Sequence, residues 1–214
     1  SSFSPKRIRS PKQFLLGKTQ MDWLLSGAKN TAADFIFIIS STGCVIPHSA
    51  YHVNPSKGTR SKGDGFPGFV HERERMLAVL DELAVPVIFI TGDVHNSASV
   101  RITDNVWEFM AGPLNSNAHP VGTLGNMPRG GPFTHEGRRV RVRWVAGFPN
   151  DVHYSRLHSA YYCIVRVNNV LKTARPEGVG LQWVAYDIPQ VVAAWYDGYT
   201  GRLVYAESVT ARGG

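Results

Sequence analysis

The chain of 214 residues is long enough for one large domain or two small ones. A hydrophobic fraction of 43% with 18% charged residues excludes an intrinsically disordered protein. No apolar run approaches the roughly 20 residues that cross a bilayer as a helix, so we expect no membrane span. The net charge of +7 favours anionic partners such as phosphates or acidic surfaces.

The first part of the chain predicts a helix and then a strand. Ser10 and Pro11 are good N-cap and first-turn residues, so we expect a helix from there to about Lys29. Residues 34–40 are almost continuously apolar, which is typical of a strand covered on both faces. Residues 41–67 lack periodicity and predict a long loop, a kind of segment that is often functional.

A second helix and a second buried strand follow. The segment 69–83 has helical apolar spacing, and its polar residues at 71–75 are expected to be mainly exposed. Residues 85–91 predict a buried strand. The order helix, strand, helix, strand predicts an α/β layered core with parallel strands.

The character of the chain changes after Ser97. We expect a hairpin around residues 104–105, a long loop at 112–136, and strands at 138–147, 159–167, 179–187, 190–196 and 202–208, the last two joined by a turn-rich connection. The organisation predicted is a single domain or domain fragment, 1–214, with an α/β half at 1–97 and a β-rich half at 98–214.

Neither the cysteines nor the start of the chain assigns a compartment. Cys44 and Cys163 lie far apart, so neither a C-x-x-C motif nor a disulfide can be inferred, and Cys163 reads as a buried small hydrophobe. The first residues show no charged and then apolar leader, so no signal peptide is visible.

The segment Gly92-Asp93-Val94-His95 is the strongest candidate for chemistry. It directly follows the second buried strand, and ligands of α/β proteins gather at the carboxyl ends of strands. Carboxylate oxygen and imidazole nitrogen are also suitable ligands for borderline and harder metal ions. The alternative is a tight turn, with Asp93 capping backbone amides and His95 at the surface.

Other polar residues occupy comparable loops. His48 and Cys44 follow the first strand and should lie near the Asp93 turn, because adjacent parallel strands end together; an exposed loop position is the alternative. Asp64 lies between glycines, a context that is typical of a turn residue and that also leaves it open as a site residue. A set after the strand 106–111 could contact an anion or be ordinary loop residues: Asn115, Asn117 and His119.

Three other functions receive little support. There is no G-x-S-x-G elbow of a serine hydrolase, and no phosphate-binding or dinucleotide-binding glycine loop. The arginines between Arg138 and Arg143 alternate with apolar residues, which favours a solvated strand face over a nucleic-acid surface.

The order of four motifs resembles the PhoD-like alkaline phosphatases, a branch of the calcineurin-like metallophosphoesterases. Residues 16–24 are similar to the family pattern L-G-x-x-Q-x-x-W-L, and residues 63–67 with 72–77 to D-G-[YF]-P followed by E-R-x-x-L-L. Residues 87–97 resemble its strand ending in G-D-V-H-x-S, and residues 107–115 its E-F-x-x-x-P-x-N segment. The resemblance covers most of residues 12–120.

The resemblance implies a metallophosphoesterase-like fold, a layered β-sandwich core flanked by helices. It implies hydrolysis of phosphomonoesters or phosphodiesters, helped by calcium, iron or zinc ions that neutralise charge on the phosphate. Asp93 and His95 would then be metal ligands and catalytic residues, with Asn115, His119 and Asp64 on the substrate side. An extracellular or periplasmic location also follows from the family.

Other motifs of that family are missing from this sequence: an early Asp, G-D-x-x-[YD], and D-D-H-[ED] with a nearby Asn. The segment 48–52 departs from the family as well. The chain therefore resembles the C-terminal half of such an enzyme, and a partner subunit or N-terminal half would complete the site. The alternative is a non-catalytic α/β binding module that keeps the scaffold without a complete metal centre.

Overall fold

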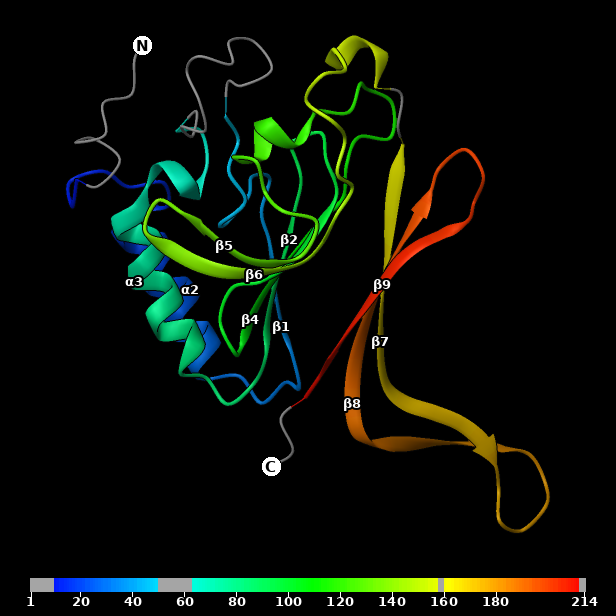
Figure 1. Ribbon diagram of the computed structural model, residues 1–214. Helices are drawn as coiled ribbons and strands as arrows, with labels where there is room; N and C mark the ends of the chain where they lie inside the picture. The colour runs from blue at the N-terminus through cyan, green and yellow to red at the C-terminus, as the bar shows by residue number, and fades with distance from the viewer. Residues whose placement is uncertain (1–9, 50–62, 158–159, 212–214) are drawn as a thin grey trace.

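The computed structural model describes residues 10–49, 63–157 and 160–211, which form two sheets and two main helices (Figure 1). The helices are α2 (Gly17–Lys29) and α3 (Val70–Asp81). The strands are β1 (Ile36–Ile39), β2 (Val87–Thr91), β3 (Ala98–Arg101), β4 (Val106–Met110), β5 (Gly131–His135), β6 (Arg138–Val145), β7 (Tyr161–Ala174), β8 (Leu181–Asp197) and β9 (Leu203–Thr210). Short 3-10 turns are η2 (Phe66–Gly68), η3 (Val121–Leu124) and η4 (Tyr154–Arg156).

The large sheet has six strands in the order β1-β2-β4-β3-β6-β5. β1, β2 and β4 run parallel, and β3, β6 and β5 continue the sheet in antiparallel pairs. The predicted hairpin formed by β3 and β4 is present, and it places β4 beside β2. The expectation of an α/β protein with parallel strands is therefore confirmed, and strands from both sides of residue 98 join one sheet.

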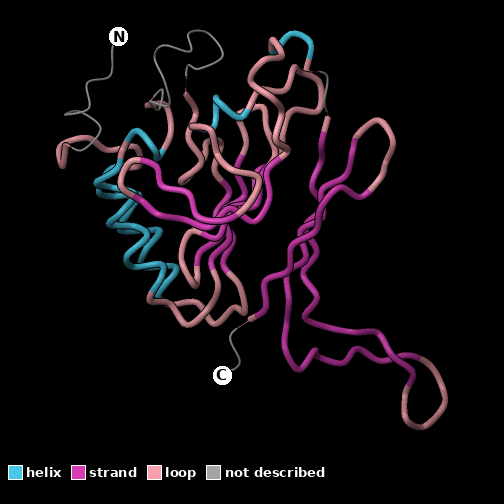
Figure 2. The backbone as a smooth tube through the Cα atoms, in the orientation of Figure 1, coloured by secondary structure: helices cyan, strands magenta, loops and turns pink. Residues whose placement is uncertain are grey.

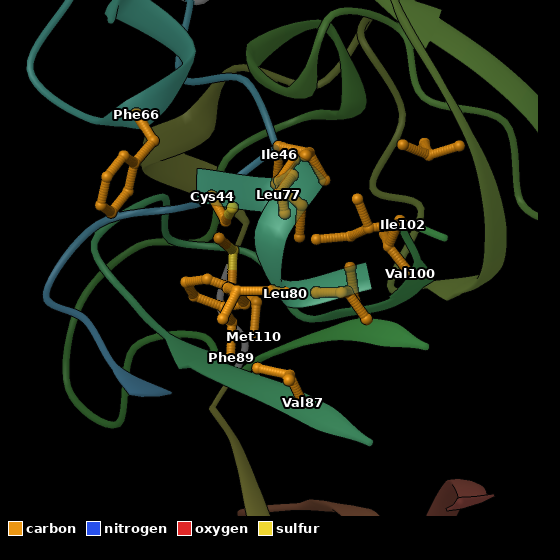
Figure 3. Close-up of a cluster of buried hydrophobic side chains, with 14 of the residues drawn as sticks. Cys44, Ile46, Phe66, Leu77, Leu80, Val87, Phe89, Val100, Ile102 and Met110 are labelled. Carbon is orange, nitrogen blue, oxygen red and sulfur yellow. The ribbon is translucent and has the colours of Figure 1, made fainter. Parts of the chain in front are cut away.

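The two faces of the large sheet bury different side chains, because neighbouring strand residues point in opposite directions. Val87 and Phe89 belong to the core that packs against α2 and α3, part of which is drawn in Figure 3. Ile88 and Phe109 belong to a second core, packed against the three-stranded sheet β7-β8-β9. The indole of Trp195 joins the two sheets by donating a hydrogen bond of 2.9 Å to the carbonyl of Met110. No helix among the described residues is long and apolar enough to cross a membrane.

Helix α2 begins at Gly17, not at Ser10 as expected. Gly17 has a φ of +74°, and the backbone N–H groups of Leu15, Leu16 and Gly17 donate to the Glu72 carboxylate at 2.6, 3.1 and 2.9 Å. Glu72, expected at the surface, is only 3% exposed. A carboxylate from the next helix therefore satisfies the amides at the start of α2, which local propensity could not foresee.

Strand β1 lies at the edge of the large sheet and is not covered on both faces as predicted. Its residues are partly buried, and Ile39 is 73% exposed. A mainly apolar cavity of about 720 Å³ lies between α2 and this strand. The apolar run thus identified the strand correctly but not its place in the sheet.

The β-rich half differs from expectation in three places. The predicted loop 112–136 contains strand β5, and the two strands expected at 179–187 and 190–196 form one strand of 17 residues, β8. β7 extends beyond residue 167 to pair with the first part of β8, so the two form a ribbon that projects from the body (Figure 2). The turn expected between residues 197 and 202 joins β8 to β9, as predicted.

Candidate metal centre

Three side chains from separate segments meet at the carboxyl ends of β1 and β2. His48 follows β1, Asp93 follows β2, and Asp64 lies in the segment before α3. Their ligand atoms all lie within 4.8 Å of one another, and His48 Nδ1 is 3.2 Å from Asp93 Oδ2. The neighbouring ends of parallel strands bring His48 and Asp93 together, as the strand order predicted.

The chemistry of this group fits a cation. One imidazole nitrogen and two carboxylates form the mixed nitrogen and oxygen set that borderline and harder divalent ions accept. A small cavity of about 10 Å³, room for about one water-sized atom, is lined by all three residues. The His48 side chain is 12% exposed and that of Asp93 is 44% exposed, so the group is reachable from solvent.

The turn after β2 has an unusual backbone. Asp93 and His95 have φ values of +72° and +53°, a left-handed conformation that costs a non-glycine residue roughly 1–2 kcal/mol. Val94 between them is 1% exposed, and its N–H donates to the carbonyl of Gly92 at 2.9 Å. Such strain persists where the surroundings fix it and is common at functional sites.

His95 is held by a second loop. Its Nδ1 lies 2.9 Å from the carbonyl of Asn117, which can only accept, so Nδ1 is the donor in this contact and a neutral ring would carry its lone pair on Nε2. The ring stacks on that of His119 with centroids 4.4 Å apart, and the backbone N–H of His119 donates to the backbone carbonyl of His95 at 2.8 Å. Asn96 adds a side-chain hydrogen bond of 2.9 Å to the carbonyl of His119. The second loop therefore fixes both the ring and its tautomer.

The structure brings together some of the expected site residues and separates others. Asp93 lies in the group with His48 and Asp64, whereas His95 stands beside it with His119. Asp64 was expected on the substrate side, but a carboxylate next to a second carboxylate suits a cation better than a phosphate. Asn115 is exposed, and no hydrogen bond or ion pair recorded among the described residues includes it.

Cys44 is unsuited to ligate a metal here. Its side chain is fully buried and free, and Cys163 is free as well. Burial, and then the negative charge of Glu108, raise the pKa of the Cys44 thiol well above its ordinary value. Because the thiolate is the form that binds metals, Cys44 serves as a core residue.

The sequence places His48 near the Asp93 turn but does not select it as a ligand. The signal that could have selected it is its place after β1, next to the strand that ends at Asp93. Glu108 belongs to the E-F-x-x-x-P-x-N motif but receives no role from the sequence, although a single acid at a core-facing position of an apolar strand is itself a signal.

The sequence matches a known protein family. Residues 2–169 match a family model described as PhoD-like phosphatase. A solved structure of PhoD is similar at 15% sequence identity and a TM-score of 0.45; the match covers 94% of this chain and 37% of that one. The chain thus spans little more than a third of the protein it matches. A search of curated proteins finds no match.

Proposed function

Because the chain belongs to the PhoD-like phosphatase family, we propose that it takes part in metal-dependent hydrolysis of phosphomonoesters or phosphodiesters. It would act as the C-terminal part, or a subunit, of such an enzyme, with residues 1–214 as one domain or domain fragment. The observation that carries the proposal is the convergence of His48, Asp64 and Asp93 at the strand ends.

The proposed ligands come from two sides of the site. His48, Asp64 and Asp93 would hold a cation, and His95 would offer its Nε2 from the same turn as Asp93. Calcium, iron and zinc all remain candidates for the ion. When bound, such an ion withdraws charge from the phosphate oxygens as a Lewis acid.

The substrate side of the proposal uses neutral and donor groups. His119 stacks on His95 and is 8% exposed, so it lies at the inner wall of the site. Asn115, exposed beyond β4, would offer its amide to a phosphate oxygen. The positive balance of the whole chain favours the approach of an anionic ester.

Metal titration of the isolated chain tests the proposal directly. We expect Ca²⁺, Fe²⁺ or Zn²⁺ to bind, and Asp93→Ala to weaken binding at least tenfold. Asp104→Ala is the control, because Asp104 is also an exposed turn aspartate but lies at the opposite end of the strands, paired with Arg101. The proposal fails if the wild type binds none of these ions or if both variants bind them equally well. Hydrolysis of p-nitrophenyl phosphate and its bis ester then distinguishes monoesterase from diesterase activity.

The alternative of a non-catalytic binding module rests on the family motifs that this sequence lacks. That alternative predicts a metal-independent complex with a protein or glycan partner. Partner binding unchanged by a chelator, in a chain that takes up no metal, would favour it over the phosphatase proposal.

A further inference from the structure

Glu108 is a fully buried acid in the middle of strand β4, with 0% of its surface exposed. It lies on the same face of the strand as Val106 and Met110, inside the core that α2 and α3 cover. An ionised carboxylate in such a place loses its hydration, which costs several kcal/mol unless hydrogen bonds replace it. Burial accordingly raises the pKa of Glu108, and the backbone and Thr91 hydrogen bonds act in the opposite direction.

Four donors replace the lost hydration. The backbone N–H groups of Cys44, Val45 and Ile46 donate to its oxygens at 2.8, 2.8 and 3.3 Å. The hydroxyl of Thr91 donates at 2.9 Å. Consecutive amides that converge on one anion form a concave nest, a known way of holding negative charge in proteins.

The backbone around this nest has no spare room. A Cβ added at Gly43 would lie 2.7 Å from the carbonyl of Ile46 and 3.2 Å from Glu108 Oε1. The segment 43–46 therefore bends tightly around the carboxylate and could not do so with a larger residue at position 43.

The donors lie next to the residues of the candidate metal centre. Ile46 precedes His48 by two residues, and Thr91 precedes Asp93 by two. The same carboxylate thus fixes the end of β2 and the segment after β1, the two places from which His48 and Asp93 approach each other at 3.2 Å.

We propose that Glu108 is a positioning residue that holds the His48 segment and the Asp93 turn at the separation the metal centre needs. Its functional meaning rests on the proposed metal-dependent activity. Loss of a group bonded directly to a ligating side chain typically lowers metal affinity about 10-fold to 100-fold. Glu108 acts through the backbone two residues from each ligand, so we expect an effect at the lower end of that range.

The test compares Glu108→Gln with a buried acid elsewhere. Glu207→Gln is the matched control, because Glu207 is also buried, at 7% exposed. It accepts hydrogen bonds from Arg143, Ser99 and Tyr205, none of which is a proposed metal ligand. Both substitutions are expected to lower stability. Only Glu108→Gln should weaken Ca²⁺, Fe²⁺ or Zn²⁺ binding about tenfold or more, and only it should speed hydrogen exchange at the amides of residues 44–46.

Thr91→Val provides a milder variant if Glu108→Gln does not fold. It removes a single hydroxyl from the carboxylate, and we expect a smaller loss of metal affinity, about threefold. The proposal is overturned if a folded Glu108→Gln variant, or Thr91→Val in its place, keeps both the metal affinity and the hydrogen exchange of the wild type. It is also overturned if Glu207→Gln loses as much metal affinity as Glu108→Gln. If the wild type binds no metal, the proposed function fails, whereas the exchange experiment still decides whether Glu108 organises residues 44–46.

Discussion

The strained turn at Asp93 makes a prediction about stability that is separate from metal binding. Asp93→Ala and Asp93→Gly both remove the carboxylate and its contact with His48, so both should lose metal affinity to the same degree. The two variants differ in the backbone, because alanine keeps a side chain at a φ of +72° and glycine does not.

The expected difference follows from two opposing terms. The left-handed conformation costs alanine roughly 1–2 kcal/mol, and the greater freedom of glycine in the unfolded chain offsets about 0.5–1 kcal/mol. Asp93→Gly should therefore be more stable than Asp93→Ala by about 1 kcal/mol or slightly less. For a chain of this size the melting temperature should differ by about 2–4 °C.

Urea unfolding of the two variants without metal measures this difference. Ala78 in α3 provides the control, because it is exposed in an ordinary helix, where Ala78→Gly should lower stability by about 1 kcal/mol. Glycine in place of alanine should therefore raise stability at position 93 and lower it at position 78. If alanine proves as stable as glycine at position 93, the turn is not strained in solution and the reasoning is wrong.

Three further predictions concern the scaffold and its pH response. Glu72→Gln should lower the free energy of unfolding by about 2–3 kcal/mol, because a buried charged acceptor of three backbone amides is replaced by a neutral one. Urea unfolding measures this loss, and a value below about 0.5 kcal/mol would contradict the capping role. Gly68→Ala should destabilise the fold by about 2 kcal/mol or more, because the added Cβ would lie 2.4 Å from the Cα of Gly63. A melting temperature equal to that of the wild type would show that the segment before α3 can move aside. Burial and the charge of Arg73 lower the pKa of His135 from 6.5 to about 4, so the unfolded chain takes up this proton first as the pH falls. Stability contributed by neutral His135 should be complete above pH 6.5 and decrease toward pH 4, by about 3 kcal/mol at most; a pH dependence of unfolding that is unchanged in His135→Gln would exclude this source.

Local sequence patterns identified most of the regular elements. Apolar runs located β1 and β2, and helical spacing located α3 within two residues at each end. The motif order also identified the family, which the match over residues 2–169 confirms. These results share a physical cause: periodic burial and turn chemistry depend on neighbours in the chain.

Other features depend on partners that are distant in the sequence. The start of α2 depends on Glu72, more than 50 residues away, and the edge position of β1 depends on which strands pair. β8 is 17 residues long because β7 pairs with both of its parts, whereas β9 pairs only with the second part. Two short apolar stretches in the sequence could not reveal this pairing.

The candidate site also combines features set by the local sequence with features set by distant partners. The sequence by itself determined that Asp93 and His95 end a buried strand, because the apolar run and the G-D-V-H turn are local. Only the tertiary structure decided that Asp64 joins Asp93 and His48, and that a buried Glu108 ties their segments together. Ligand spacing is a distance between segments, so it is set by strand pairing and by core hydrogen bonds rather than by residue order.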